Sequence, residues 1–444
     1  MGDPQAFDVI IAGGGMAGGS VAAALDRLGL RTLVVEPGLD SSKRLAGELI
    51  HPPGVANLAE LGLLGSLEAA GGAPVLGFAV VGDGQSYRLP YASLGTLRLT
   101  GFAMEHAAIA STLRAAVARL PHVAVWDGAR VVAVHLDAPE AVGVTISRRG
   151  DYTKLNARLL VAADGAASST RRLAGIGCRR RRLSSMLGFM LPGGRLPHPG
   201  FGTVFIDGPA PALAYHVGPD SVRVMFNVPD NPHGVDAATR DLAYLAALPP
   251  LLREDVRQAM DARRGLASAS YSVVPDAVAR HRVVLVGDAA GCCHPLTATG
   301  LSVCTRDAVR LRDALRASGG DVPAALRHYA AQRAGPQRTR MALAEALYAV
   351  FVARTPEARL LRQGLLRYWE SSPRGRAASM TLLSTEEGRM SVMAREYAWV
   401  VRYTLAALLT RTEPRPLRRW TRAAFGLSLA TLRYAGETLR GLLV

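Results

Sequence analysis

The chain has 444 residues, of which 49% are hydrophobic and 20% charged, so it is long enough to bury one large core or two modest ones. Its formal net charge of +16 comes almost entirely from arginine, and no aromatic-rich basic module accompanies it, so we expect no nucleic-acid partner. Four cysteines without metal-ligand spacing predict neither a disulfide framework nor a metal site, and they indicate a reducing, cytoplasmic compartment.

The first predicted strand, residues 7–12, runs into Gly13, Gly15 and Gly18, which have the GxGxxG spacing and precede an alanine-rich helix. Gly13 would make the tight turn, Gly15 would let the backbone approach a pyrophosphate, and Gly18 would allow close packing of the helix on the strand. The phosphates would lie at the helix N-terminus. The spacing therefore predicts a dinucleotide-binding unit.

A second strand, residues 31–35, ends in Glu36, which lies about 20 residues beyond the glycines, where an acidic side chain binds an adenosine ribose hydroxyl. We expect Met16 and Ala17, which open the intervening helix, to contact the same cofactor. The alternative is a glycine-rich turn without a ligand, but the complete unit is much more specific than the glycines alone.

A third apolar strand, residues 159–163, leads into Asp164, Gly165, Ser168 and Arg171. Taken by itself, this sequence is also typical of a solvated turn with a helix N-cap. Its position between the other cofactor elements is what makes it a candidate.

The most informative segment is residues 283–301, with the sequence VVLVGDAAGCCHPLTATGL. Residues 283–286 predict a buried strand, and Gly287 permits a sharp exit from it. Asp288 follows where its carboxylate can accept a hydrogen bond from a ribityl hydroxyl.

The same segment predicts a helix over residues 301–315. Pro295 and Gly300 are expected to shape the loop that opens this helix. Its free N–H groups and the positive end of its dipole would face an electron-rich ring edge.

The three elements, in this order, resemble the p-hydroxybenzoate hydroxylase class of FAD-dependent monooxygenases, in which the segment at Asp164 closes over the flavin. Residues 44–64, RLAGELIHPPGVANLAELGLL, narrow the resemblance to the squalene monooxygenases (squalene epoxidases). The HPLT sequence at 294–297 and the region 343–384 are similar to the same family.

The resemblance implies FAD as cofactor, dioxygen as co-substrate, and NAD(P)H or a partner flavin or NADPH reductase as electron donor. In this class the reduced flavin forms a C4a-hydroperoxide, whose distal oxygen is transferred to an electron-rich carbon. By position, the resemblance implies cofactor contacts from Glu36, Arg44, Arg114, Val131, Asp164, Gly287, Asp288, Pro295, Gly300 and Leu301.

The chain departs from the family beside the expected flavin ring. Residues 291–293 read Gly-Cys-Cys instead of Asn-Met-Arg, residues 298–300 read Ala-Thr-Gly instead of three glycines, and His51 replaces a glutamine. These departures do not affect the prediction of flavin binding, but they leave the substrate open.

We expect epoxidation of an alkene in a hydrophobic polyprenyl or polyene substrate. The open alternatives are hydroxylation of a quinone or a lipid-tailed phenol, and reduction of a prenyl chain without oxygen. An alkene needs no protein base, whereas phenol hydroxylation is helped by one. His51 and His294 are the catalytic candidates for that role, with structural hydrogen bonding as the alternative for each.

The predicted fold is α/β, with a Rossmann-like FAD-binding domain, an inserted mixed β-sheet substrate domain and a C-terminal helical region. The FAD-binding domain is expected to be discontinuous, with residues 1–75, 101–180 and 276–340. The substrate domain would use residues 76–100 and 181–275, and residues 341–444 would be helical.

The C-terminal segment combines positive charge with apolar clusters. From Arg395 onward there are nine arginines and three glutamates, and no uncharged run approaches the roughly 18 residues that a bilayer span needs. This pattern predicts either a helix lying on the inner face of a membrane or a helix packed on the protein's own core.

Overall fold

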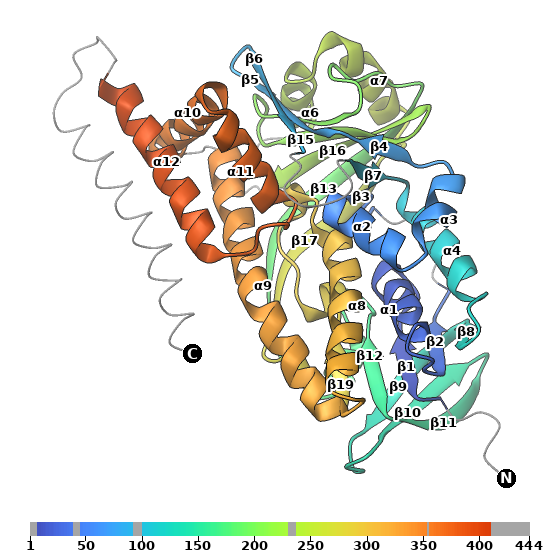
Figure 1. Ribbon diagram of the computed structural model, residues 1–444. Helices are drawn as coiled ribbons and strands as arrows, with labels where there is room; N and C mark the ends of the chain where they lie inside the picture. Colours follow the sequence, from blue (N-terminus) through green and yellow to red (C-terminus); the bar gives the residue numbers. More distant parts are fainter. Residues whose placement is uncertain (1–6, 39–44, 92–99, 230–236, 353–354, 410–444) are drawn as a thin grey trace.

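The computed structural model describes residues 7–38, 45–91, 100–229, 237–352 and 355–409 (Figure 1). Its first large sheet has six strands in the order β18-β19-β12-β1-β2-β8, which are parallel except for β18. The strands predicted at residues 7–12, 31–35, 159–163 and 283–286 all lie in this sheet. The bounds are β1 Val9–Ala12, β2 Thr32–Glu36, β8 Val123–Asp127, β12 Leu159–Ala162, β18 Ala279–Arg280 and β19 Val283–Leu285.

Both faces of the six-stranded sheet are covered. The covering elements are helices α1 Met16–Asp26, α4 His106–Val117 and α8 Gly300–Ala317, and an antiparallel sheet of β9 Ala129–His135, β10 Val142–Arg148 and β11 Asp151–Ala157. Successive strand residues point to opposite faces, so Val9 and Ile11 pack on the helices while Ile10 and Ala12 pack on the antiparallel sheet. This double burial explains why the strands are continuous apolar runs in the sequence.

The second large sheet has seven strands in the order β17-β13-β16-β15-β14-β5-β6. Its outer face packs against α6 Ala237–Ala246 and α7 Pro250–Asp261 through Val222, Val224 and Phe226. The strands are β5 Gly77–Gly82, β6 Gln85–Pro90, β13 Cys178–Pro192, β14 Phe201–Phe205, β15 Ala212–Gly218, β16 Ser221–Pro229 and β17 Leu266–Pro275.

The opposite face of this sheet, which we call the inner face, carries the alternate residues of β16 and β13. Arg223, Met225 and Asn227 of β16 lie there, directly across from Met190, Gly188 and Met186 of β13. Four of these six residues are methionine or glycine, and Arg223 and Asn227 are the polar ones.

Short elements connect the two large sheets. A small sheet has the order β3-β7-β4, and β4 and β7 contact β15 of the seven-stranded sheet. The bounds are β3 Leu49–Ile50, β4 Ala73–Val75, β7 Gly101–Ala103, α2 Pro52–Glu60, α3 Leu64–Ala69 and α5 Ser169–Leu173, with 3-10 turns at Gly287–Ala290 and Pro295–Thr297.

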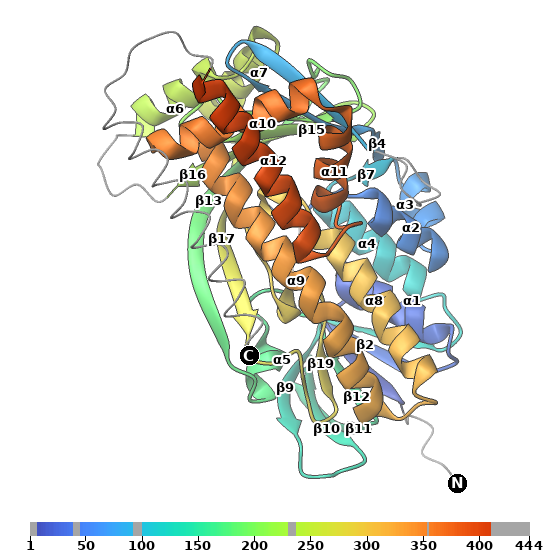
Figure 2. The same ribbon diagram turned by 60° about the vertical axis from the view of Figure 1, so that its left-hand side comes forward.

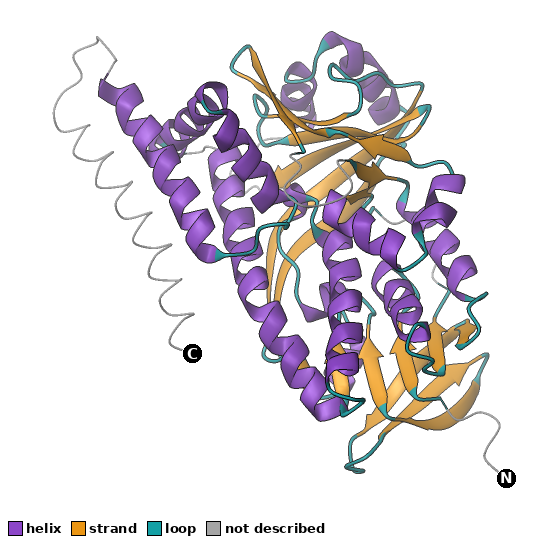
Figure 3. Ribbon diagram, in the orientation of Figure 1, coloured by secondary structure: helices purple, strands orange, loops and turns teal. Residues whose placement is uncertain are grey.

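The C-terminal helices lie together beside the seven-stranded sheet (Figure 3). They are α9 Val322–Val352, α10 Pro356–Ser371, α11 Pro373–Leu383 and α12 Met390–Leu409. The helical region thus begins before residue 341, and Figure 2 shows α9 running from the six-stranded sheet to the seven-stranded sheet.

None of the helices in the described ranges is long and apolar enough to cross a bilayer. The C-terminal membrane prediction falls mainly on residues 410–444, outside the described residues.

Helices α8 and α9 hold the segment that follows β19. Asp307 of α8 and Arg333 of α9 form an ion pair, with 3.0 Å between Arg333 Nε and Asp307 Oδ2, and neither side chain is more than 3% exposed. Asp307 Oδ2 also accepts a hydrogen bond from Gly287 N–H at 2.9 Å, and Arg333 Nη1 donates to Ala290 O at 2.8 Å. We call Asp307 and Arg333 the loop clasp.

The substitution Asp307→Ala should lower the free energy of unfolding by about 3–5 kcal/mol, because it leaves the Arg333 guanidinium buried without its counter-charge. The control is Asp313→Ala on the same helix, where the side chain is 46% exposed and the expected loss is below about 1 kcal/mol. Urea denaturation followed by circular dichroism compares the two variants. If both variants lost the same free energy of unfolding, the buried loop clasp would stabilise the protein no more than an exposed ion pair does.

Candidate active site

The residues predicted to bind the cofactor follow four neighbouring parallel strands. Gly13 follows β1, Glu36 ends β2, Asp164 comes after β12 and Gly287 comes after β19. Because these strands run in one direction, their carboxyl ends meet at one edge of the sheet, which we call the carboxyl edge. Open parallel sheets bind their ligands at this edge.

The glycine loop after β1 is shaped by contacts that a side chain would block. Gly13 has a φ of 103°, and a Cβ on it would lie 2.6 Å from Ala163 O. A Cβ on Gly18 would overlap the carbonyl oxygen of Gly13. A Cβ on Gly15 would meet no atom within 4 Å, so the backbone there is open to an approaching group.

Glu36 and Arg114 lie beside this loop. The Glu36 carboxylate accepts hydrogen bonds from Gly14 N–H at 2.6 Å and Gly38 N–H at 3.2 Å. A Cβ on Gly14 would lie 3.2 Å from Arg114 Cδ, so Arg114 of α4 reaches the same place. The structure thus places a carboxylate and a guanidinium group side by side at the glycine loop.

Two helices begin near the carboxyl edge without a side-chain cap. The N-cap residues are Gly15 for α1 and Thr299 for α8, and neither makes a side-chain hydrogen bond to its helix. The first N–H groups of a helix need partners, and the helix dipole favours a negative partner. A pyrophosphate and an electron-rich ring edge fit these two N-termini.

Asp288 is half-buried in the segment that follows β19, while its neighbours from Val283 to Gly287 are fully buried. A Cβ on Gly300 would lie 3.8 Å from Asp288 Oδ1, so the carboxylate is next to the start of α8. The sequence predicted that Gly300 shapes the preceding loop, but the left-handed residue there is Ala298, with a φ of 51°. Gly300 is instead the first residue of the helix.

The Asp164 carboxylate forms hydrogen bonds with residues at the start of α5. Its carboxylate accepts hydrogen bonds from the hydroxyls of Ser168 and Ser169 and, at 2.9 Å, from Thr170 N–H. These bonds cap the helix and hold the segment in place. They correspond to the capped turn that the sequence offered as the alternative to direct cofactor contact.

The other predicted contacts differ in accessibility. Arg44 lies outside the described residues. Pro295 is exposed and Gly300 is half-buried. Four predicted contacts have side chains that are only 4–7% exposed: Met16, Ala17, Val131 and Leu301. These residues can therefore meet a cofactor mainly through their backbone.

His51 is fully buried between the two large sheets. Its Nε2 lies 2.9 Å from Thr297 O, and its Nδ1 lies 2.8 Å from the Tyr91 hydroxyl. Since a carbonyl oxygen only accepts, Nε2 carries the proton and Nδ1 accepts from Tyr91. Burial lowers the pKa of His51 from 6.5 to about 4, so the ring is neutral near pH 7.

His294 is held in a similar way. Leu296 N–H donates to its Nδ1 at 3.1 Å, so its proton lies on Nε2, which is 3.0 Å from Ser184 Oγ and 3.2 Å from Asn227 Oδ1. The ring centroid is 4.3 Å from that of Tyr348. Burial lowers the pKa of His294 to about 4. Both histidines therefore make structural hydrogen bonds with both ring nitrogens.

A buried charge network was not predicted from the sequence. Arg223 Nη2 lies 2.7 Å from Glu48 Oε1, both side chains are at most 4% exposed, and the Tyr215 hydroxyl donates to Glu48 Oε2 at 3.0 Å. This network joins the loop before α2 to the inner face. The available signal was one arginine in the apolar run VRVMF at residues 222–226.

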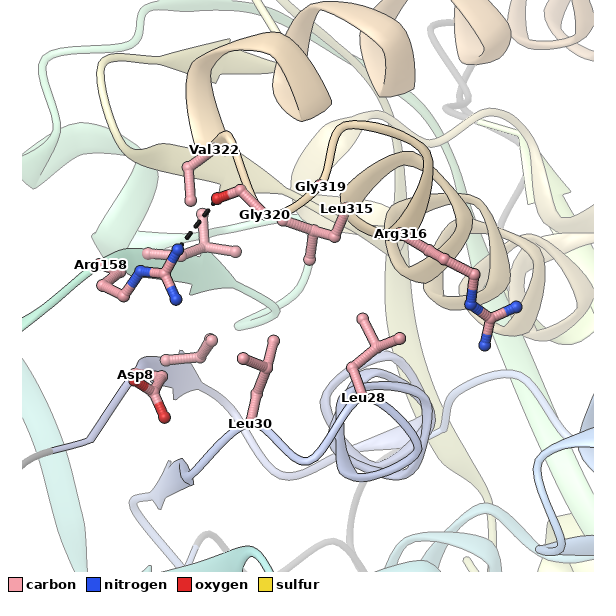
Figure 4. A pocket seen from close by; sticks show the side chains of 11 residues that line it. Asp8, Leu28, Leu30, Arg158, Leu315, Arg316, Gly319, Gly320 and Val322 are labelled. Carbon is pink, nitrogen blue, oxygen red and sulfur yellow. Dashed lines mark hydrogen bonds between the residues drawn. The ribbon is translucent and has the colours of Figure 1, made fainter.

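Two cavities lie away from the carboxyl edge. A cavity of about 210 Å³ is lined by Asp8, Val9, Arg158 and Leu159, at the amino ends of β1 and β12 (Figure 4). A cavity of about 620 Å³ is lined by residues 277–282, before β19. In the described part of the chain, no group of three or more His, Cys, Asp or Glu side chains could hold a metal ion.

Acid should destabilise the protein through the two buried histidines. The pKa of His51 is lower in the folded state, so the unfolded chain binds more protons between about pH 4 and 6.5, and stability falls as pH drops through that window. His51→Gln should reduce this fall by up to about 3 kcal/mol. The measurement is the urea unfolding midpoint at several pH values, with the exposed His328→Gln as control. An unchanged pH dependence in His51→Gln would contradict a neutral, buried His51.

A family model described as squalene epoxidase matches residues 156–419, which is more than half of the chain. Squalene monooxygenase of Mus musculus is 29% identical over 419 residues, covering 90% of this chain and 71% of the mouse protein. Squalene epoxidase erg1 of Aspergillus fumigatus is 29% identical over 386 residues, covering 82% of this chain and 79% of that protein.

Solved structures show the same fold. The crystal structure of pqsL, a probable FAD-dependent monooxygenase from Pseudomonas aeruginosa, has a TM-score of 0.61 and 24% identity, and it covers 85% of this chain and 99% of that one. At this identity the likeness concerns the fold alone. The match to the family model over most of the chain shows that this protein belongs to the squalene epoxidase family of flavin-dependent monooxygenases.

Proposed function

We propose that the protein holds FAD at the carboxyl edge and transfers one atom of dioxygen to an alkene of a hydrophobic polyprenyl or polyene substrate bound on the inner face. The observation that carries this proposal is the convergence of the open Gly15 backbone, the Glu36 carboxylate and the Asp288 carboxylate at one edge. The family membership supports the same chemistry.

Each group of residues has a separate role in the proposed site. Glu36 and Arg114 would bind the adenosine half, and the N-terminus of α1 would bind the pyrophosphate. Asp288 would accept a ribityl hydroxyl, and the N-terminus of α8 would face the ring edge that becomes anionic on reduction. Arg44 and the Val131 backbone would complete the cofactor contacts.

The flavin, once reduced by NAD(P)H or a partner reductase, would supply the oxygen transfer through its C4a-hydroperoxide. The chain would position the alkene and keep water from the reacting atoms. Methionines suit this task on the inner face, because their flexible thioether side chains adapt to an irregular apolar ligand. Met186, Met190 and Met225 lie there.

The state of the histidines favours epoxidation over phenol hydroxylation. A phenol would be activated by a base within hydrogen-bond reach. His51 and His294 are neutral, and the nitrogens that could accept a proton already accept from Tyr91 and from Leu296 N–H. An alkene needs no such base, so this arrangement is compatible with the proposed reaction.

The protein should purify yellow with non-covalent FAD. Asp288→Ala should weaken FAD binding by about 1–3 kcal/mol, since a buried ribityl hydroxyl would lose its acceptor. Fluorescence titration of the apoprotein with FAD measures the loss, and Asp313→Ala on α8 is the control. A colourless protein that does not take up FAD would refute the proposal.

One oxygen atom of the product should come from dioxygen. Incubation of the reduced holoenzyme with squalene or farnesol under isotopically labelled dioxygen should give a product one labelled oxygen heavier, measured by mass spectrometry. Turnover in the absence of dioxygen would instead support prenyl reduction.

A further inference from the structure

Asn227 presents a buried hydrogen-bond donor without a partner. Its side chain is 1% exposed, and its Nδ2 is among the buried polar atoms of the described residues that make no hydrogen bond. Buried polar groups in folded proteins are nearly always paired, so such an atom calls for an explanation. The location of Asn227 on the inner face, where the substrate is proposed to bind, suggests that a substrate atom is the missing partner.

The orientation of the Asn227 amide is fixed by its neighbours. Leu296 N–H donates to His294 Nδ1, which places the ring proton on Nε2. That N–H faces Asn227 Oδ1 at 3.2 Å, so the amide oxygen must be on this side and the NH2 group on the other. The backbone is fixed too, because Asn227 N–H donates to Pro211 O at 3.1 Å and its carbonyl accepts from the Tyr244 hydroxyl.

Apart from His294 and Ser184 on its amide-oxygen side, the neighbours of Asn227 on the inner face are methionines. Met186 is its cross-strand neighbour, and Met225 is the next residue of β16 on the same face. Met190 and Met225 remain partly exposed, so the inner face is not sealed. Leu296, from the loop that leads into α8, packs against the same apolar cluster. Asn227 therefore lies where the substrate sheet meets the loop that leads to the proposed flavin ring.

A pure hydrocarbon has no atom that can accept the free N–H of Asn227. We infer that the substrate carries an oxygen atom, as a hydroxyl, ether or carbonyl, in addition to its isoprenoid chain, and that Asn227 Nδ2 donates a hydrogen bond to that oxygen. This inference rests on the proposed function, because it names the substrate class for the same site. It makes Asn227 a specificity-determining residue that selects an oxygenated polyprenoid.

The test compares three ligands with one isoprenoid chain: farnesol, farnesyl methyl ether and farnesene. Binding to the oxidised holoenzyme is followed by the change in flavin absorbance or protein fluorescence, so no turnover is needed. The alcohol and the ether should both bind at least about tenfold more tightly than the hydrocarbon, because each offers an acceptor to the donor. In Asn227→Leu this preference should disappear, with farnesene binding unchanged or tighter.

Thr203→Val is the matched control. Thr203 Oγ1 is also buried without a partner, but Thr203 pairs with Ala214 and lies on the outer face, so its removal should leave the preference intact. Equal affinity of the unaltered protein for all three ligands, or binding of none of them, would overturn the inference without any variant. A preference that persists in Asn227→Leu, or that is lost in Thr203→Val, would do the same. Failure to bind FAD or to incorporate dioxygen would refute the proposed function separately.

Discussion

Buried positive charge around the segment after β19 is the constraint on which the rest of the structure depends. Three guanidinium groups from α5 and α9 donate to three consecutive carbonyl oxygens of this segment, and the loop clasp fixes its first N–H. Since these carbonyl oxygens accept hydrogen bonds from the arginines, they point away from the carboxyl edge and do not present their negative ends there. The three bonds run from Arg171 to Ala289 O, from Arg333 to Ala290 O and from Arg340 to Gly291 O.

The parts of the fold that local chemistry determines could be predicted from the sequence. The tight turn after β1 was predicted from the spacing of its glycines. The structure shows why glycine is needed there: Gly13 has a φ of 103°, and a Cβ on Gly13 or Gly18 would clash with neighbouring backbone atoms. The strands follow from runs of apolar residues buried on both faces. Glu36 follows from its spacing, because β2 lies next to β1 in the parallel sheet. The flavin-dependent monooxygenase family was predicted correctly, from the resemblance of these elements, of residues 44–64 and of residues 294–297 to known sequences.

Contacts between distant segments could not be predicted in the same way. Glu48 and Arg223 are separated by 175 positions, and only the folded sheets bring them together. The left-handed backbone of Ala298, with a φ of 51°, was likewise not predicted, because alanine rarely adopts this conformation. The proposed role of Asn227 could not be predicted from the sequence, because the orientation of its amide depends on which nitrogen of His294 carries the proton.

The Glu48 and Arg223 pair has a consequence for how the inner face can change. Either charge would be left alone in apolar surroundings if the other were replaced, whereas a joint replacement by apolar residues of similar volume can be tolerated. Redesign of the protein for another substrate would therefore have to alter both positions in one step. A single substitution at either position would therefore be expected to lower stability, even where the corresponding double substitution does not.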